Sequence, residues 1–155
     1  MSERPGIQDF LADHERTPGI TRRIRIYSRQ PQMSDEQAQS LRLAAEREFL
    51  ATERLHHINV VTALDRVDTD LGSAVVFEHN RHAIRLDHWL AEHLELDLED
   101  RLSIIRQLAE TLQSVHRRRV THRALPAGGS ILVRRGEEAE PRWVVLVTDF
   151  SLAWS

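Results

Sequence analysis

The sequence contains no cysteine and no lysine. Without cysteine the chain has no disulfide bond, no zinc–thiolate site and no thiol nucleophile, which fits a reducing compartment such as the cytoplasm. All 21 of its Lys and Arg residues are therefore arginines, so neither Schiff-base chemistry nor a lysine contact to phosphate is available. A bias toward GC-rich codons explains the missing lysines more simply than selection against lysine chemistry does.

Long apolar stretches and a strong net charge are also missing. No apolar run approaches the roughly 20 residues needed to cross a bilayer, and the first residues lack the apolar core of a signal peptide. The formal net charge of −3 gives no global attraction to nucleic acid or to an anionic membrane. With 155 residues, 41% of them apolar, the chain is long enough for one core. We expect a soluble, cytoplasmic domain without nucleic-acid or membrane partners.

Hydrophobic spacing and turn residues predict a mixture of strands and helices. Ser34 is followed by two acids, a pattern typical of a helix start. The predicted elements, in chain order, are strands at 9–14 and 20–27, a helix from 34, strands at 60–67 and 73–78, helices at 86–94 and 98–117, and a hairpin of 131–133 with 143–147.

Two polar residues lie on faces of these helices that are predicted to be buried. The stripe of the first helix is Leu41, Ala45, Glu48, Thr52 and Leu55. Glu48 needs a partner there, because an unpaired buried charge costs on the order of several kcal/mol, unless the face is half buried and the carboxylate is solvated. The stripe of the last helix runs Leu98, Leu102, Ile105, Ala109, Leu112 and His116. His116 at its end is expected to be a hydrogen-bonded core histidine.

Two further features have simple explanations. His56-His57 invites a metal site, but no third ligand stands at a metal-like spacing, so a turn before the next strand is favoured. Arg117-Arg118-Arg119 is a local basic run, and the end of a helix, where the macrodipole favours cations, explains it better than a phosphate site does.

The C-terminal hairpin carries the most specific pattern. His122-Arg123-Ala124-Leu125 precedes its first strand, Ser130 begins that strand, and Thr148-Asp149-Phe150-Ser151 follows its second strand. A carboxylate at the end of a buried strand is well placed to hold a metal ion beside a cleft, although Asp149 alone would indicate only a strand-end turn. The combination resembles the protein-kinase catalytic loop, H-R-D-L-x-x-x-N, and the D-F-G metal-binding motif.

Other segments are similar to the same family. Arg47-Glu48 and the segment 55–61 resemble its αC helix and the following H-P-N-I-V sequence. The strand at 73–78 resembles the one that ends at the gatekeeper, here Phe77, and the resemblance then places the hinge from Glu78 and His79. Segments 86–90 and 112–123 resemble αD and the end of αE.

This resemblance covers about residues 10–155 and implies a fold and a domain organisation. The implied fold is α+β and protein kinase-like, with an antiparallel N-lobe sheet and its αC helix, followed by a partial helical C-lobe. The implied organisation is a single partial domain, 1–155, with the N-lobe at about 1–79 and the hinge and truncated C-lobe at 80–155. A protein partner, or the remainder of a longer chain, is expected to cover the missing part of the C-lobe.

The departures from the family fall at chemically important positions. Ala124 stands where the family has its catalytic-base Asp, and Ser130 where it has a metal-binding Asn, with one extra residue between them. Arg25 aligns with the lysine of V-A-I-K and would pair with Glu48, yet its planar fork does not simply replace lysine at the α- and β-phosphates. No G-x-G-x-x-G precedes the first strand, so the grip on a triphosphate should be weakened.

The resemblance therefore favours a pseudokinase, a regulatory or scaffolding module that retains at most residual binding of ATP with Mg²⁺ or Mn²⁺. The alternatives are an active, unconventional Ser/Thr kinase and an interaction domain that binds no nucleotide. His122 would be structural, and Arg123, which in the family contacts a phosphorylated activation segment, would be solvated or paired with a nearby acid. The residues implied for nucleotide are Arg25, Glu48, Phe77, Glu78, His79 and Asp149, and those for metal are Asp149 and, more weakly, Ser130.

Overall fold

The computed structural model describes residues 6–123, 125, 129–151 and 153. The elements are β1 (Ile7–Asp13), β2 (Thr21–Tyr27), α1 (Asp35–Glu53), β3 (Ala63–Thr69), β4 (Gly72–Glu78), β5 (Ile84–Arg85), α2 (Leu86–Glu92), α3 (Leu98–Arg117), β6 (Ile131–Arg135) and β7 (Trp143–Val147). Within the described residues, one sheet has the strand order β1-β2-β4-β3 and a second has the order β5-β6-β7. The α+β architecture expected from the sequence is confirmed.

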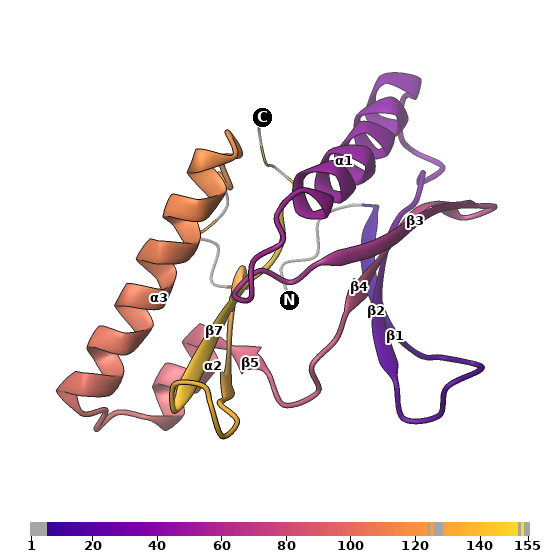
Figure 1. Ribbon diagram of the computed structural model, residues 1–155. Coiled ribbons are helices and arrows are strands. Elements are labelled where there is room, and N and C mark those ends of the chain that lie inside the picture. Colours follow the sequence, from indigo (N-terminus) through magenta and orange to yellow (C-terminus); the bar gives the residue numbers. More distant parts are fainter. Residues whose placement is uncertain (1–5, 124, 126–128, 152, 154–155) are drawn as a thin grey trace.

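The N-terminal sheet is antiparallel throughout and is packed against α1. Figure 1 shows α1 lying beside this sheet, while α3 lies beside β7 in the C-terminal part. β1 and β2 form a hairpin whose register pairs Asp9 with Arg25 and Asp13 with Thr21. Gly19, with a φ of 86°, supplies the left-handed residue that closes the turn between them.

Local sequence signals set the start of α1. The Ser34 hydroxyl accepts a hydrogen bond from the Gln37 N–H, and the Gln37 side chain accepts one from the Ser34 N–H, which together form a capping box. The predicted N-cap is therefore confirmed. The helix ends at Glu53, so Leu55, predicted to lie on its stripe, follows the helix, where it is nevertheless 1% exposed and part of the core.

The strand predicted at 60–67 begins later, at Ala63. Val60 and Val61 instead meet the end of β7, where the Val61 N–H donates to the Val147 carbonyl and the Val147 N–H donates to the Asn59 carbonyl. Because these bonds run to a strand more than 80 residues away, no local pattern could have revealed them. They tie the segment after α1 to the C-terminal hairpin.

The residue range of α3 matches the prediction, but the predicted buried face is wrong. Leu98, Leu102 and Ile105 are 72%, 53% and 61% exposed, and His116, predicted to be in the core, is exposed as well. The face that packs against the rest of the protein carries Asp100, Ile104, Gln107, Thr111 and Val115. Its polar members are hydrogen-bonded: Gln107, for example, donates to the Trp143 carbonyl and accepts from the Val145 N–H.

The segment predicted to form a helix at 86–94 is helical over a shorter range, because α2 ends at Glu92. Within it, Trp89 is 2% exposed whereas Leu90 is 46% exposed. His93 stacks on Trp89 with a centroid distance of 4.4 Å, and both rings contact Trp143 edge-on at 5.0 Å. This aromatic cluster helps to join α2 to the start of β7.

The C-terminal hairpin is present as predicted, with β6 and β7 paired from Ile131 opposite Val147 to Arg135 opposite Trp143. The short strand β5, which was not predicted, pairs with β6 and follows residues 79–83, the segment leaving the N-terminal sheet. No helix among the described residues is both long enough and apolar enough to cross a membrane.

Candidate functional site

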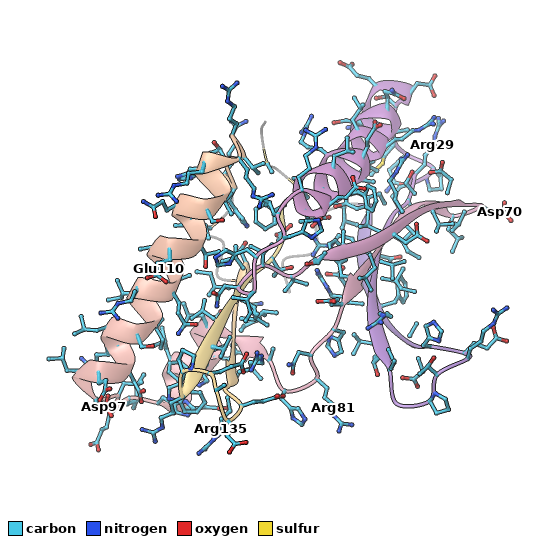
Figure 2. All side chains as sticks on the ribbon, viewed as in Figure 1. Arg29, Asp70, Arg81, Asp97, Glu110 and Arg135 are labelled. Carbon is cyan, nitrogen blue, oxygen red and sulfur yellow. The ribbon has the colours of Figure 1, made fainter. Side chains whose placement is uncertain are left out.

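A cleft of about 820 Å³ lies where the N-terminal sheet meets the C-terminal hairpin. Its walls come from β1, β2, the segment 78–80 after β4, and the ends of β6 and β7. The residues that line it include Asp9, Arg23, Arg25, Glu78, His79, Thr148 and Asp149. Charged side chains elsewhere, such as Asp70 at the β3–β4 turn and Arg81 after β4, lie on the outside of the protein (Figure 2).

Arg25 on β2 is the centre of the charged groups in this cleft. Its Nε and Nη2 donate to the two carboxylate oxygens of Asp9, at 2.8 and 2.9 Å. Its Nη1 donates to Glu48 Oε1 at 3.1 Å and to Asp149 Oδ1 at 2.8 Å. One guanidinium therefore links β1, α1 and the segment after β7 by way of three carboxylates.

Glu48 on α1 is the most deeply buried of the three acids, with a side chain that is 0% exposed. Besides Arg25, it accepts a hydrogen bond from the Tyr27 hydroxyl. The partner that a buried carboxylate requires is therefore present, and the solvated alternative for Glu48 is wrong. The pairing of Arg25 with Glu48 anchors α1 to the middle of the sheet.

The pKa values in this network shift in directions set by burial and by the opposing charges. Burial raises the pKa of the Asp9 carboxyl, but its hydrogen bonds to Arg25 outweigh that effect and lower it overall. Burial lowers the pKa of Arg25, whereas the bonds to Asp9 and the charge of Glu48 raise it overall. Complete burial raises the pKa of Glu48, and the Arg25 charge opposes the rise.

Arg23, two residues earlier on β2, points into the same cleft. Its guanidinium lies over the Phe77 ring, 4.3 Å from the centroid, and Nη2 donates to Thr148 Oγ1 at 3.0 Å. Nη1 lies 3.6 Å from Asp9 Oδ2. Burial, followed by the charge of Arg23, lowers the pKa of His79 below its usual range. The positions predicted for the gatekeeper and hinge thus lie beside a guanidinium.

On the C-terminal side of the cleft, Asp149 is the second residue after β7, and its backbone φ is 65°. Its Oδ1 accepts from Arg25 and from the Ser151 hydroxyl, the latter at 2.8 Å. Left-handed backbone is tolerated better by Asp than by most residues. The turn holds the carboxylate toward β2, where its side chain remains 18% exposed.

His122 and Phe150 form the support beneath Asp149. His122 is 1% exposed, and its Nε2–H donates to the Thr148 carbonyl at 2.7 Å. Phe150 is fully buried and packs edge-on against the His122 ring with a centroid distance of 4.5 Å. Burial lowers the pKa of His122, so the ring is neutral at physiological pH. These contacts fit a structural part for the histidine.

The other sequence-predicted residues have different surroundings. Ser130, immediately before β6, is buried, and its carbonyl accepts from the Thr148 N–H at 2.9 Å, which places it next to the residue before Asp149. Arg123 is exposed, with a φ of 65°. Ala124, at the predicted base position, lies outside the described residues. Among the residues that the structure describes, no group of three or more His, Asp or Glu side chains is arranged to hold a metal ion.

Sequence reasoning missed Asp9, Arg23 and Tyr27. Asp9 could have been found from the turn signal at Thr17-Pro18-Gly19, which predicts a hairpin. If the turn is centred on Thr17, residues equally far from it on the two strands are paired, and Asp9 lies opposite Arg25. Arg23 could also have been found, since alternate residues of a strand share one face and Arg25 was already assigned to the site.

Comparison with known proteins agrees with this arrangement. The model of the protein tyrosine and serine/threonine kinase family matches residues 21–155. The chain belongs to this kinase family. It is also 34% identical, over 143 residues, to a protein of Streptomyces coelicolor named "Probable kinase PglW". The match covers 90% of this chain but only 9% of that protein, so the chain corresponds to a small part of the relative.

Kinases use ATP with a divalent metal, and their conserved lysine contacts the phosphates and the glutamate of the αC helix. In this chain Arg25 and Glu48, which the resemblance predicts to be the corresponding pair, form an ion pair. Two features do not fit a metal-bound triphosphate: both oxygens of Asp9 are bound in the fork of Arg25, and Asp149 accepts from the same guanidinium. As arranged here, the donors that would contact phosphate are engaged by carboxylates of the chain itself.

Proposed function

We propose that this chain is the kinase-like part of a regulatory or scaffolding protein and does not itself transfer a phosphoryl group. The observation that carries the proposal is the bond of Asp149, the residue that matches the metal-binding Asp of the family, to Arg25 at 2.8 Å. Phosphoryl transfer needs that carboxylate on a metal and a base near the acceptor hydroxyl. Ala124 at the base position cannot accept a proton, and Ser130 is a poorer metal ligand than Asn.

An active, unconventional kinase is the second candidate, and specific contacts favour it. The Arg25–Glu48 pair is formed, Phe150 is packed under His122, and both features accompany an assembled site in the family. The relative from Streptomyces coelicolor is named a probable kinase. In this reading the base comes from another residue, and Asp149 leaves Arg25 when ATP with Mg²⁺ or Mn²⁺ binds.

Phosphotransfer assays separate these two candidates. Purified chain is incubated with ATP, with magnesium or manganese, and with a generic Ser/Thr substrate, and all products are examined by mass spectrometry beside an Asp149→Asn control. The proposal expects no more phosphorylated product from the wild type than from the variant. Phosphorylation by the wild type that disappears in Asp149→Asn would establish the kinase and overturn the regulatory reading.

An interaction domain that binds no nucleotide is the third candidate. This hypothesis predicts that no adenine analogue binds at residues 78–80, which the kinase resemblance assigns to the hinge, whereas the first candidate allows such binding. Binding of an adenine analogue there, detected by thermal stabilisation that is lost on blocking the cleft with a bulky Ala83→Phe substitution, would remove this candidate, since Ala83 lines the cleft.

We also propose that protein covers the exposed apolar face of α3, either a partner or a further part of a longer chain. Leu98, Leu102 and Ile105 form this face, and each is more than half exposed. Three large aliphatic side chains together on one helix are unusual on a surface that has no partner. A cytoplasmic location agrees with the absence of cysteine.

A further inference from the structure

The carboxylate of Asp9 lies in the cleft against Arg25, the residue that the kinase resemblance aligns with the phosphate-contacting lysine. It projects from β1 directly opposite Arg25, and its two oxygens accept from Nε and Nη2 of that arginine at 2.8 and 2.9 Å. A guanidinium binds carboxylate and phosphate with the same paired geometry. The fork of Arg25 therefore already holds an anion that belongs to the chain.

The second arginine of the cleft is turned toward the same carboxylate. Arg23 Nη1 lies 3.6 Å from Asp9 Oδ2, and its Nη2 is bonded to Thr148. The side chain of Asp9 is 27% exposed, so it lies at the wall of the cleft rather than beneath it. An anion that enters from the solvent must compete with Asp9 for both guanidinium groups.

Charge balance makes that competition unfavourable for a polyphosphate. Asp9, Glu48 and Asp149 carry three negative charges around Arg25, against the two positive charges of Arg25 and Arg23. A triphosphate that displaced Asp9 would leave this carboxylate unpaired, and even with one bound Mg²⁺ it would bring a net negative charge beside the other two carboxylates. Like charges held together in a desolvated site oppose binding strongly.

We propose that Asp9 is a specificity-determining residue that excludes nucleoside triphosphates, so that the cleft admits uncharged, nucleoside-sized ligands that leave the Asp9–Arg25 pair intact. This inference rests on the proposed function, because it concerns the ligand of the same regulatory site. It goes further by assigning the exclusion to one side chain. The space beside residues 78–80 remains open for such a ligand, whereas the end near Arg25 is closed to phosphate.

The test is titration calorimetry of the full chain with magnesium-ATP and, separately, with adenosine, which lacks the phosphates. The variant Asp9→Asn keeps the size of the side chain and an acceptor for Arg25 but removes the negative charge. The matched control is Asp13→Asn, the same change at the exposed end of the same strand, where the carboxylate accepts a hydrogen bond from the Thr21 hydroxyl.

The expected result is an affinity for ATP at least about tenfold higher in Asp9→Asn than in the wild type, because a charged competitor for a charge-assisted bond has been removed. Adenosine binding should change less than about twofold, and Asp13→Asn should behave as the wild type does. Asp9→Ala provides a second variant if Asp9→Asn does not fold, as judged by circular dichroism.

Two outcomes would overturn the inference. One is an ATP affinity that is the same in the wild type, Asp9→Asn and Asp9→Ala, whether strong or undetectable. The other is a gain that appears equally with adenosine, since phosphate would then have no part in it. Neither outcome bears on phosphoryl transfer, which the separate product assay tests, so failure of the inference and failure of the proposed function can be told apart.

Discussion

Replacing Arg25 with methionine should be among the most destabilising single changes in this protein. Methionine is similar in length and apolar, so it fills the space without supplying a donor to any of the three carboxylates. Among the described residues, Glu48, which is 0% exposed, would keep only the Tyr27 hydroxyl as a hydrogen-bond donor, and Asp9 and Asp149 would lose their 2.8 Å bonds. Removing one member of a buried ion pair costs about 3–5 kcal/mol, a large share of the roughly 5–15 kcal/mol that stabilises a typical domain.

The pH dependence of this loss tests its electrostatic cause. Burial already raises the pKa of Glu48, and removing the Arg25 charge removes the main effect that opposes the rise. The same substitution removes the bonds that lower the pKa of Asp9. A carboxyl whose pKa is higher in the folded than in the unfolded protein gains protons on folding, so the variant should recover stability, relative to the wild type, as the pH falls from about 7 to about 5.

The measurement is urea denaturation of the wild type and Arg25→Met at these two pH values, beside Arg22→Met as a matched control. Arg22 is on the same strand but, by the alternation of side chains, on the opposite face, so its substitution should cost less than about 1 kcal/mol. An Arg25→Met variant that is as stable as Arg22→Met, or a loss that does not depend on pH, would refute the reasoning.

Two further predictions concern the support of the site and the face of α3. His122→Asn should cost about 1–3 kcal/mol at pH 7.5 by removing the bond from Nε2 to the Thr148 carbonyl. Because burial lowers the pKa of His122, the wild type should lose stability as the pH falls below about 6.5, and the variant should lose less. Equal losses of unfolding free energy between pH 7.5 and 5.5, measured with urea for the wild type and the variant, would contradict the assignment. Ile104→Ala should lower the free energy of unfolding by about 2–5 kcal/mol, whereas Ile105→Ala should change it by less than about 0.5 kcal/mol. The reason is that Ile104 is 8% exposed and Ile105 is 61% exposed. Equal thermal unfolding midpoints for the two variants would mean that α3 presents a different face to the core.

Elements fixed by local chemistry could be predicted from the sequence. The capping box at Ser34 starts α1, and Asp97 caps α3 by accepting from the Asp100 N–H. The β6–β7 hairpin follows from two apolar runs around a polar loop. The motifs around His122 and Asp149 were recognisable for the same reason, because each is a short continuous segment.

Features that depend on distant partners could not be predicted in the same way. Gln107 is buried although it is polar, because it bonds to β7 and to Asn59. The hydrophobic pattern therefore selected the opposite, exposed face of α3. Val60 was assigned to a strand, whereas it bridges to Val147. Hydrophobic periodicity registers which side chains are apolar, not which polar ones will find partners.

The most direct test of the account follows the Nε–H of Arg25, which donates to Asp9 at 2.8 Å. In ¹⁵N-labelled protein this group gives a nuclear magnetic resonance signal that Arg25→Met identifies by its disappearance. The account predicts a slowly exchanging proton whose signal does not move when millimolar magnesium-ATP is added, and which shifts with ATP in Asp9→Asn. A saturable shift of this signal with ATP in the wild type would show that Asp9 yields to phosphate, and it would contradict the account.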